Sequence, residues 1–234
     1  MKLHRFIGKF YFTKSPMIIS DAEILNQWRN VLKLKVGEEL ILGDGQLNEA
    51  RGKILRLNQN GAELEILEVY TNQNEPEREV SLYCAILKRE NFEFVIQKAT
   101  EVGVKKIVPL ITKRTVKMGL RPDRLEKIIK EAAEQSGRGI APQLAEALDF
   151  RKALEVVGAD SLNLIFDASG NSYSQILKNI GIKEVNIFIG SEGGWDEKEL
   201  ELAKESNFQI ASLGKLTLRA ETAAVIATYL VINL

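Results

Sequence analysis

Three glycines within five residues follow a predicted apolar strand near the C-terminal end of this 234-residue chain, in residues 190–194 (Gly-Ser-Glu-Gly-Gly). Glycines let a backbone approach a ligand closely and adopt positive φ. Asp196, just beyond, is expected to cap a following helix. A tight strand-to-helix turn would also explain this pattern, but three glycines are more than such a turn needs. Because Glu192 would repel phosphate and the Walker lysine is absent, the loop is predicted to receive a neutral or cationic ligand.

A second segment with chemical potential is residues 212–224, where a strand is predicted to end and an alanine-rich helix to begin around Arg219. A cation at a helix start opposes the macrodipole. A residue that breaks a local rule without local gain suggests a function. The alternative interpretation is an ion pair between Arg219 and Glu221 or a neighbouring acid.

Two further segments carry polar side chains that could bind a ligand. Residues 131–138 indicate a helix that ends at Gly137 in the left-handed conformation, which leaves Gln135 and Arg138 to be explained. In residues 97–104, Lys98 and Glu101 share one helix face, where a solvated surface pair is the simpler interpretation.

The composition excludes several classes of site. With one histidine, His4, and one cysteine, Cys84, the chain can form neither a zinc cluster nor a Ser-His-Asp triad, and we expect no metal. Cys84 lies in an apolar run and is predicted to be a core residue. No apolar run reaches the ~18 residues of a membrane span, and the N-terminus has no signal-peptide pattern. These features predict a cytoplasmic protein without membrane contact.

Charge is balanced overall, with 32 basic and 32 acidic residues, but it is unevenly distributed. Residues 105–138 contain ten basic and four acidic residues, whereas residues 184–205 contain two basic and seven acidic ones. A local basic face can bind phosphate on a neutral protein because screening confines each charge to roughly 10 Å. A solvated helix face is the alternative interpretation of the basic stretch.

The first 70 residues are predicted to form a small β-rich module. Strands are expected at 17–19, 39–42 and 62–69, with a turn at 43–45 and a helix capped by Asp21. The polar segment 70–79 contains a proline and shows no apolar periodicity, so it is interpreted as a linker.

After the linker, apolar strands alternate with helical segments. The predicted strands are 81–87, 107–111, 162–166, 185–189 and 209–213, and the predicted helices are 92–102, 122–136, 150–157, 197–206 and 220–232. This alternation favours an α/β domain with a parallel sheet covered on both faces. Ligand sites in such sheets gather at the carboxyl ends of strands, here just after residues 111, 166, 189 and 213.

Together and in this order, the four segments resemble the ribosomal small subunit methyltransferase E family of the SPOUT class. The resemblance rests on residues 97–104 and 107–110, 134–138, 189–195 and 213–223, and includes Arg5-Phe6 and residues 31–37. The chain departs from the family pattern at Ser191, Ser136 and Lys33, which stand in place of proline, cysteine and arginine. Lysine does not reproduce the bidentate phosphate grip of arginine.

The resemblance implies an N-terminal PUA-like β-barrel followed by a SPOUT-type α/β domain with a parallel sheet and a trefoil knot. The expected division is 1–70 for an RNA-binding module, 71–79 for a linker and 80–234 for the methyltransferase domain. The implied activity is methylation of uridine N3 in 16S ribosomal RNA of the small subunit, with S-adenosyl-L-methionine as cofactor. A homodimer with its cofactor pocket near the subunit interface is also implied.

The resemblance also implies the site residues. Arg219 is the catalytic candidate, whose guanidinium would stabilise negative charge on the uracil carbonyl oxygens. The expected cofactor-binding residues are Ile189, Gly190, Ser191, Glu192, Gly193, Gly194, Leu213, Gly214, Leu218, Arg219 and Thr222. The expected RNA-binding residues are Arg5, Lys33, Lys88, Arg114, Lys117, Arg121, Gln135 and Arg138.

Three alternatives remain open to the sequence: another SPOUT enzyme that methylates a ribose 2′-oxygen or a different base, a non-catalytic RNA-binding protein of ribosome assembly, and a nucleotide-binding α/β enzyme. The missing phosphate-loop signatures disfavour the last of these.

Overall fold

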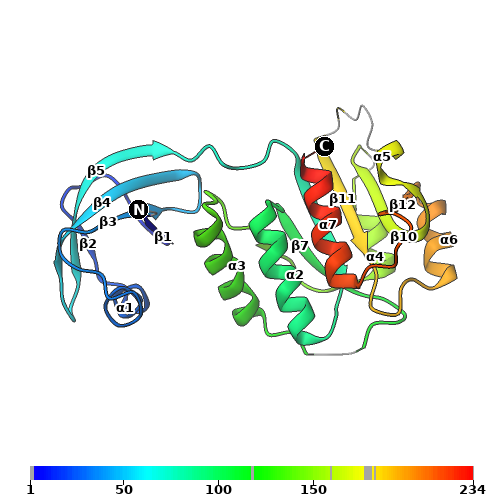
Figure 1. Cartoon of the computed structure of the whole chain (residues 1–234), viewed down its shortest axis with the longest axis horizontal. Helices are drawn as coiled ribbons and strands as arrows, with labels where there is room; N and C mark the ends of the chain where they lie inside the picture. Colours follow the sequence, from blue (N-terminus) through cyan, green and yellow to red (C-terminus); the bar gives the residue numbers. More distant parts are fainter. Residues whose placement is uncertain (1–2, 117–118, 159, 177–180, 182, 234) are drawn as a thin grey trace. The chain divides into compact units, whose positions relative to one another are not determined.

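A computed structural model of the chain describes residues 3–116, 119–158, 160–176, 181 and 183–233. The chain divides into two compact units, which are described one at a time (Figure 1). Unit 1 comprises Met1–Glu75 and Ala133–Ile140, and unit 2 comprises Pro76–Ala132 and Ala141–Leu234.

Unit 1 contains a five-stranded mixed sheet in the order β1-β3-β4-β5-β2, in which only the β1–β3 pair is parallel. Its strands are β1 (His4–Ile7), β2 (Met17–Ile19), β3 (Glu39–Gly43), β4 (Asn48–Leu57) and β5 (Ala62–Thr71). The three predicted strands are confirmed, but β1 and β4 were missed. β4 lacks an apolar pattern because it contains the charged residues Glu49, Arg51 and Lys53. Glu49 is nevertheless buried, with 1% of its surface exposed.

One short helical segment completes the core of unit 1. α1 (Ala22–Asn26) is capped as predicted, because the Asp21 carboxylate accepts a hydrogen bond from the Ile24 N–H at 3.0 Å. A π-helical turn (Gln27–Val31) follows directly and places Trp28, which is fully buried, against Phe6 with a ring-centroid distance of 5.2 Å. The apolar residues of the inward-facing strand positions close around these two rings.

Unit 2 is built on a parallel sheet, as the sequence predicted. The strand order is β12-β10-β11-β6-β7-β8, and β9 pairs with β7. Its strands are β6 (Glu79–Ala85), β7 (Lys106–Ile111), β8 (Gln143–Leu144), β9 (Leu148–Asp149), β10 (Leu162–Ser172), β11 (Glu184–Ile189) and β12 (Gln209–Ser212). All five predicted strands are present; the two-residue strands β8 and β9 are too short to leave a periodic signal.

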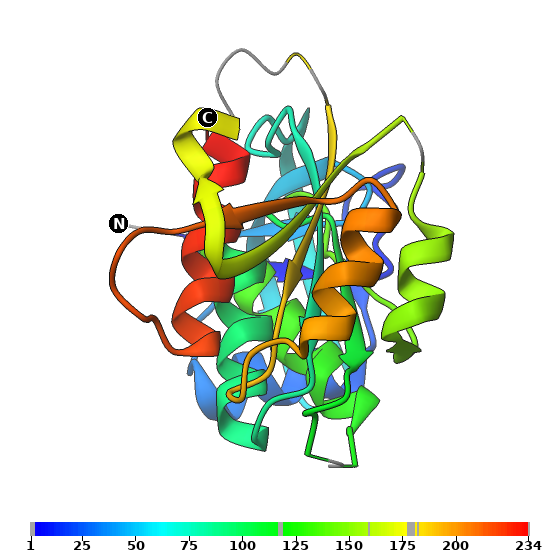
Figure 2. The same ribbon diagram turned by 90° about the vertical axis from the view of Figure 1, so that its right-hand side faces the viewer.

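Helices cover both faces of this sheet. They are α2 (Arg89–Val102), α3 (Pro122–Ser136), α4 (Phe150–Val156), α5 (Tyr173–Ile176), α6 (Glu197–Glu205) and α7 (Ala220–Asn233). Figure 2 shows α2 and α7 on one face and α4 and α6 on the other. Side chains alternate between the faces: Leu82 and Cys84 join the core beneath α2 and α7, whereas Tyr83 joins the core beneath α4 and α6. Of these helices only the single turn α5 was not predicted.

Strand β10 continues past its predicted end at Phe166. Phe166 and Asn171 both pair with Ala211 of β12, so residues 167–170 bulge out of the sheet. A Cβ on Gly170 would lie 2.6 Å from the Ile210 carbonyl oxygen, which is closer than real Cβ atoms come. Only glycine therefore lets the two segments pass each other here.

Candidate cofactor site

Three loops of unit 2 surround a cavity of about 680 Å³. One of them is the bulge that follows Phe166 within β10, the other two follow the carboxyl ends of β11 and β12, and the starts of α2 and α7 complete the wall. Three of the four predicted strand ends, after residues 166, 189 and 213, therefore meet at one place. The segment after residue 111 does not line this cavity. A cavity of this size at the strand ends is typical of a small-molecule site in an α/β domain.

The glycine-rich loop after β11 is held in a tight turn. The Gly194 N–H donates a hydrogen bond to the Ser191 carbonyl oxygen at 2.8 Å, and Gly194 has a φ of +70°. The Trp195 indole N–H donates to the Phe166 carbonyl oxygen at 3.0 Å, which joins this loop to β10 at the residue before its bulge. A Cβ on Gly190 would lie 3.2 Å from the Trp195 ring, so the loop needs a small residue there.

The helix after this loop begins as predicted. Asp196 accepts a hydrogen bond from the Lys198 N–H, and Glu199 accepts one from the Asp196 N–H at 2.9 Å, which makes a capping box for α6. Lys113 reaches Asp196 at 2.7 Å between Nζ and Oδ2. This lysine and the Lys198 N–H lower the pKa of the Asp196 carboxyl.

The loop after β12 leads into Arg219 at the start of α7. Gly214 has a φ of +132°, and the Ala223 N–H donates to the Arg219 carbonyl oxygen at 2.8 Å. The Arg219 side chain is exposed and lines the cavity. The alternative of a pair with Glu221 is not realised in the structure: among the described residues, Arg219 forms no ion pair.

The predicted cofactor residues, except Thr222, all line the cavity. Leu216 and Thr217, within the predicted cofactor loop 213–218, also line it. Residues of the wall that the sequence did not single out as cofactor contacts are Lys88, Asn91, Phe166, Asp167, Ala168, Trp195, Ser212, Ala220, Glu221 and Ala223. The strand-end rule pointed to the segment after Phe166. Nothing in the local sequence indicated that Glu221 lines the cavity whereas Thr222, the next residue, does not.

The other two predicted ligand segments have structural roles in the described residues. Gly137 caps α3 with a φ of +84°, as predicted. Lys98 pairs with Glu101 at 2.8 Å between Nζ and Oε1, which is the surface pair that the simpler interpretation described. Cys84 is fully buried, as expected of a core residue.

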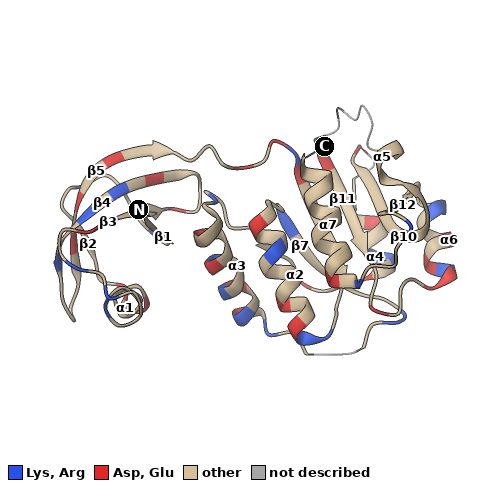
Figure 3. Ribbon diagram, viewed as in Figure 1, with Lys and Arg blue, Asp and Glu red and all other residues tan. Residues whose placement is uncertain are grey.

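The predicted RNA contacts have different surroundings. Lys33, Lys88, Arg114, Arg121 and Gln135 are exposed, and Lys117 lies outside the described residues. The ribbon of α3 in Figure 3 carries basic and acidic positions mixed along its length, which is also the pattern of a solvated helix face. Their exposure leaves these five side chains accessible to a phosphate.

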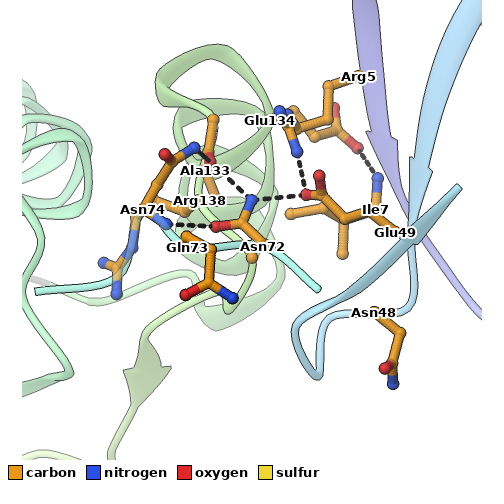
Figure 4. A network of polar contacts seen from close by, with 12 residues as sticks. Arg5, Ile7, Asn48, Glu49, Asn72, Gln73, Asn74, Ala133, Glu134 and Arg138 are labelled. Carbon is orange, nitrogen blue, oxygen red and sulfur yellow. Dashed lines mark hydrogen bonds and ion pairs between the residues drawn. The ribbon is translucent and has the colours of Figure 1, made fainter. Parts of the chain in front are cut away.

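Arg5 belongs to a polar network in unit 1 (Figure 4). Its guanidinium pairs with the buried carboxylate of Glu49. The Asn72 side-chain amide donates to Glu49 Oε1 at 2.8 Å and to the Gly137 carbonyl oxygen at 3.1 Å. Asn74 donates to the same carbonyl oxygen at 2.9 Å. Residues 72–74, interpreted from the sequence as linker, are thus ordered parts of unit 1.

Arg138 also forms an ion pair inside unit 1. It is 5% exposed, and its Nη2 lies 2.6 Å from Glu75 Oε2. Glu75 further accepts hydrogen bonds from the N–H groups of Gly139 and Ile140 at 3.0 and 3.2 Å. These contacts favour a structural role for Arg138 and Arg5 over direct phosphate binding, because a paired and buried guanidinium has few donors left.

None of the described helices combines the length and apolar character that a membrane span needs. The described histidine, cysteine and acidic side chains form no group of three that could hold a metal ion.

Comparison with known proteins identifies the class of enzyme to which this fold and cavity belong. A family model for the RNA methyltransferase domain matches residues 73–232. The chain is an RNA methyltransferase and belongs to the ribosomal RNA small subunit methyltransferase E family, as the sequence motifs predicted.

Two curated relatives and one solved structure illustrate the similarity. Ribosomal RNA small subunit methyltransferase E of Mesomycoplasma hyopneumoniae is 37% identical over 74% of this chain and 77% of the relative. The enzyme of the same name from a Synechocystis species is 35% identical over 95% of this chain and 77% of the relative. The crystal structure of the Neisseria gonorrhoeae enzyme, bound to S-adenosyl methionine, has a TM-score of 0.88 at 29% identity and covers 97% of this chain and 95% of its own.

Proposed function

We propose that this protein methylates N3 of a uridine in the 16S ribosomal RNA of the small subunit, with S-adenosyl-L-methionine as methyl donor. The observation that carries the proposal is the position of Arg219, exposed in the wall of the cavity formed by the glycine-rich loops. The curated relatives are named for methylation of small-subunit ribosomal RNA.

The cavity fits the cofactor chemically. Three carboxylates line it, those of Asp167, Glu192 and Glu221, and the glycine-rich loop leaves backbone groups accessible. These three carboxylates outnumber the two cations of the wall, Lys88 and Arg219, so the wall suits a cationic ligand better than a phosphate. Bound S-adenosyl-L-methionine supplies an activated methyl group. In this proposal the cofactor is held by residues 189–194, Leu213, Gly214 and Leu218. Arg219, also predicted as a cofactor contact, lines the cavity and is assigned here to the RNA base, and Thr222 remains a predicted contact that does not line the cavity.

Arg219 acts on the RNA base. Uracil N3 must lose a proton before it is methylated, and the resulting negative charge spreads onto the flanking carbonyl oxygens. A guanidinium near those oxygens stabilises the charge and favours the deprotonated base. Arg219 has its donors free for this task, because it forms no ion pair among the described residues.

The remaining parts of the proposal concern architecture and location. The sheet within residues 1–70 acts as a PUA-like barrel that holds RNA, and residues 80–234 act as the methyltransferase domain. The linker predicted at 71–79 begins after Glu75, because unit 1 extends to that residue. The loops 190–194 and 213–218 belong to a trefoil knot. Lys33, Lys88, Arg114, Lys117, Arg121 and Gln135 contact RNA, while Arg5 and Arg138 support the module that does so. The protein works as a cytoplasmic homodimer.

The test is methylation of small ribosomal subunits from cells that lack this protein, followed by mass mapping of the modified base. The wild-type protein is expected to modify one uridine at N3, and Arg219→Ala to lose about 100-fold in rate while retaining S-adenosylhomocysteine binding. Arg151→Ala, which changes an exposed arginine outside the cavity, serves as the matched control.

Two results would count against the proposal. A methyl group on a ribose 2′-oxygen or another base would assign a different reaction. A near wild-type rate for a folded Arg219→Ala variant would remove Arg219 from the chemistry.

A further inference from the structure

One carboxylate in the cavity wall has hydrogen-bonding capacity that the described chain does not use. Glu221 is the second residue of α7 and lines the cavity. Its Oε2 is buried and accepts no hydrogen bond from any described residue. A buried charged oxygen without a donor is costly, so a donor from outside the chain is expected.

The other two carboxylates in the wall are already engaged. Asp167 Oδ1 accepts hydrogen bonds from the backbone N–H and the hydroxyl of Ser169 at 2.9 and 2.6 Å. Glu192 Oε1 accepts one from the Lys88 N–H at 3.1 Å. Each of these two carboxylates accepts its hydrogen bonds through one oxygen, and Glu221 differs from both because its oxygen without a donor is buried.

The position of Glu221 favours a cationic donor. The first turn of a helix stabilises a carboxylate in its charged form, through the macrodipole and the free N–H groups. The nearest cation in sequence, Arg219, is exposed and forms no ion pair in the described part of the chain. A charged acceptor gains most from a charged donor, because such hydrogen bonds are roughly twice as strong as neutral ones.

We propose that Glu221 binds the α-ammonium group of the methionine part of the cofactor, an inference that rests on the proposed function. The α-ammonium group is a full positive charge with N–H donors, whereas the sulfonium has no N–H and the ribose hydroxyls are neutral. Glu221 thus selects donors that carry an intact amino-acid portion. Arg219, two residues earlier at the start of the same helix, then contacts the uracil base and not the cofactor.

Calorimetry with two ligands tests this assignment without turnover. S-adenosylhomocysteine keeps the α-ammonium group, and methylthioadenosine lacks the whole amino-acid portion. Glu221→Gln is expected to lower the affinity for S-adenosylhomocysteine at least tenfold and to leave the affinity for methylthioadenosine unchanged, because the substitution removes the charge of the side chain with almost no change in its shape. Glu197→Gln is the matched control, since it makes the same change in the first turn of α6 at an exposed residue outside the cavity.

The two ligands separate the possible outcomes. Unchanged methylthioadenosine binding shows that the variant is folded with an intact cavity. An equal loss for both ligands would assign Glu221 to the adenosine half, and no loss for either would leave it without a cofactor contact; both results overturn the proposal. If the wild-type protein bound neither ligand, the proposed function itself would fall.

Discussion

Arg114 donates a hydrogen bond from Nη1 to the Gly193 carbonyl oxygen at 2.6 Å. The contact joins the loop after β7 to the glycine-rich loop of the cavity, and the Ser191 hydroxyl returns a hydrogen bond to the Arg114 carbonyl oxygen at 3.3 Å. Arg114 was predicted from the sequence as a phosphate contact. Its observed partner adds a role in shaping the cofactor loop, because the guanidinium holds the Gly193 carbonyl group within the turn that the Gly194 N–H closes on Ser191.

Replacing Arg114 is therefore expected to affect cofactor binding. Arg114→Ala should lower the affinity for S-adenosylhomocysteine about tenfold, since a hydrogen bond that involves a charged group contributes roughly 1.5 kcal/mol. Isothermal titration calorimetry without RNA measures the effect. Arg151→Ala should leave the affinity unchanged, and an equal affinity for both variants would limit Arg114 to RNA contact.

Gly170 should not tolerate a side chain. A Cβ there would lie 2.6 Å from the Ile210 carbonyl oxygen and 2.7 Å from the Ala211 carbonyl carbon, both of which are backbone atoms. Gly170→Ala is expected to lower the free energy of unfolding by about 3 kcal/mol, the upper range for overpacking. Urea denaturation measures this, with Gly119→Ala as control because no atom lies within 4 Å of its added Cβ. Equal stabilities would show that the bulge can relax.

Arg138 should contribute to stability more than to RNA affinity. Arg138→Ala leaves Glu75 without its buried partner, and losing one partner of a buried ion pair costs about 3 kcal/mol. Arg121→Ala removes an exposed arginine and should change stability by less than about 0.5 kcal/mol. Urea denaturation measures the stability of both variants. If Arg138→Ala had wild-type stability, Arg138 would again be assigned to phosphate binding.

Cys84 links stability to alkaline pH. Burial, and then the nearby Glu192 carboxylate, raises the pKa of the thiol. Because the folded state holds the proton more tightly than the unfolded chain, the contribution is fully present below the ordinary thiol pKa of about 8.5 and is lost as pH rises above it.

Two measurements check this linkage. The free energy of unfolding should fall between pH 8 and pH 10, and the fall should be smaller in Cys84→Ala, although the buried Tyr83, whose pKa burial also raises, contributes to both. In the folded protein the thiol should stay unreacted with a thiol reagent at pH 8. Rapid labelling of the native protein would contradict the burial of Cys84.

Local patterns in the sequence predicted the parts of this fold that depend on neighbours along the chain. The bounds 122–136 of α3, the caps at Asp21 and Asp196 and the left-handed Gly137 follow from residue types within one helical turn. The strands of the parallel sheet were visible because they are buried on both faces and read as continuous apolar runs. β4 was missed for the opposite reason, since its charged residues conceal a strand that is half exposed.

Tertiary structure alone decided which distant residues meet. The motifs around Arg219 and residues 190–194 suggested a ligand site, but only the strand order β12-β10-β11 brings Phe166, the glycine-rich loop and Glu221 to one cavity. Arg138 looked available for phosphate until the fold paired it with Glu75, 63 residues away. The partner of a charged side chain depends on chain packing over such separations, and neither composition nor periodicity records it.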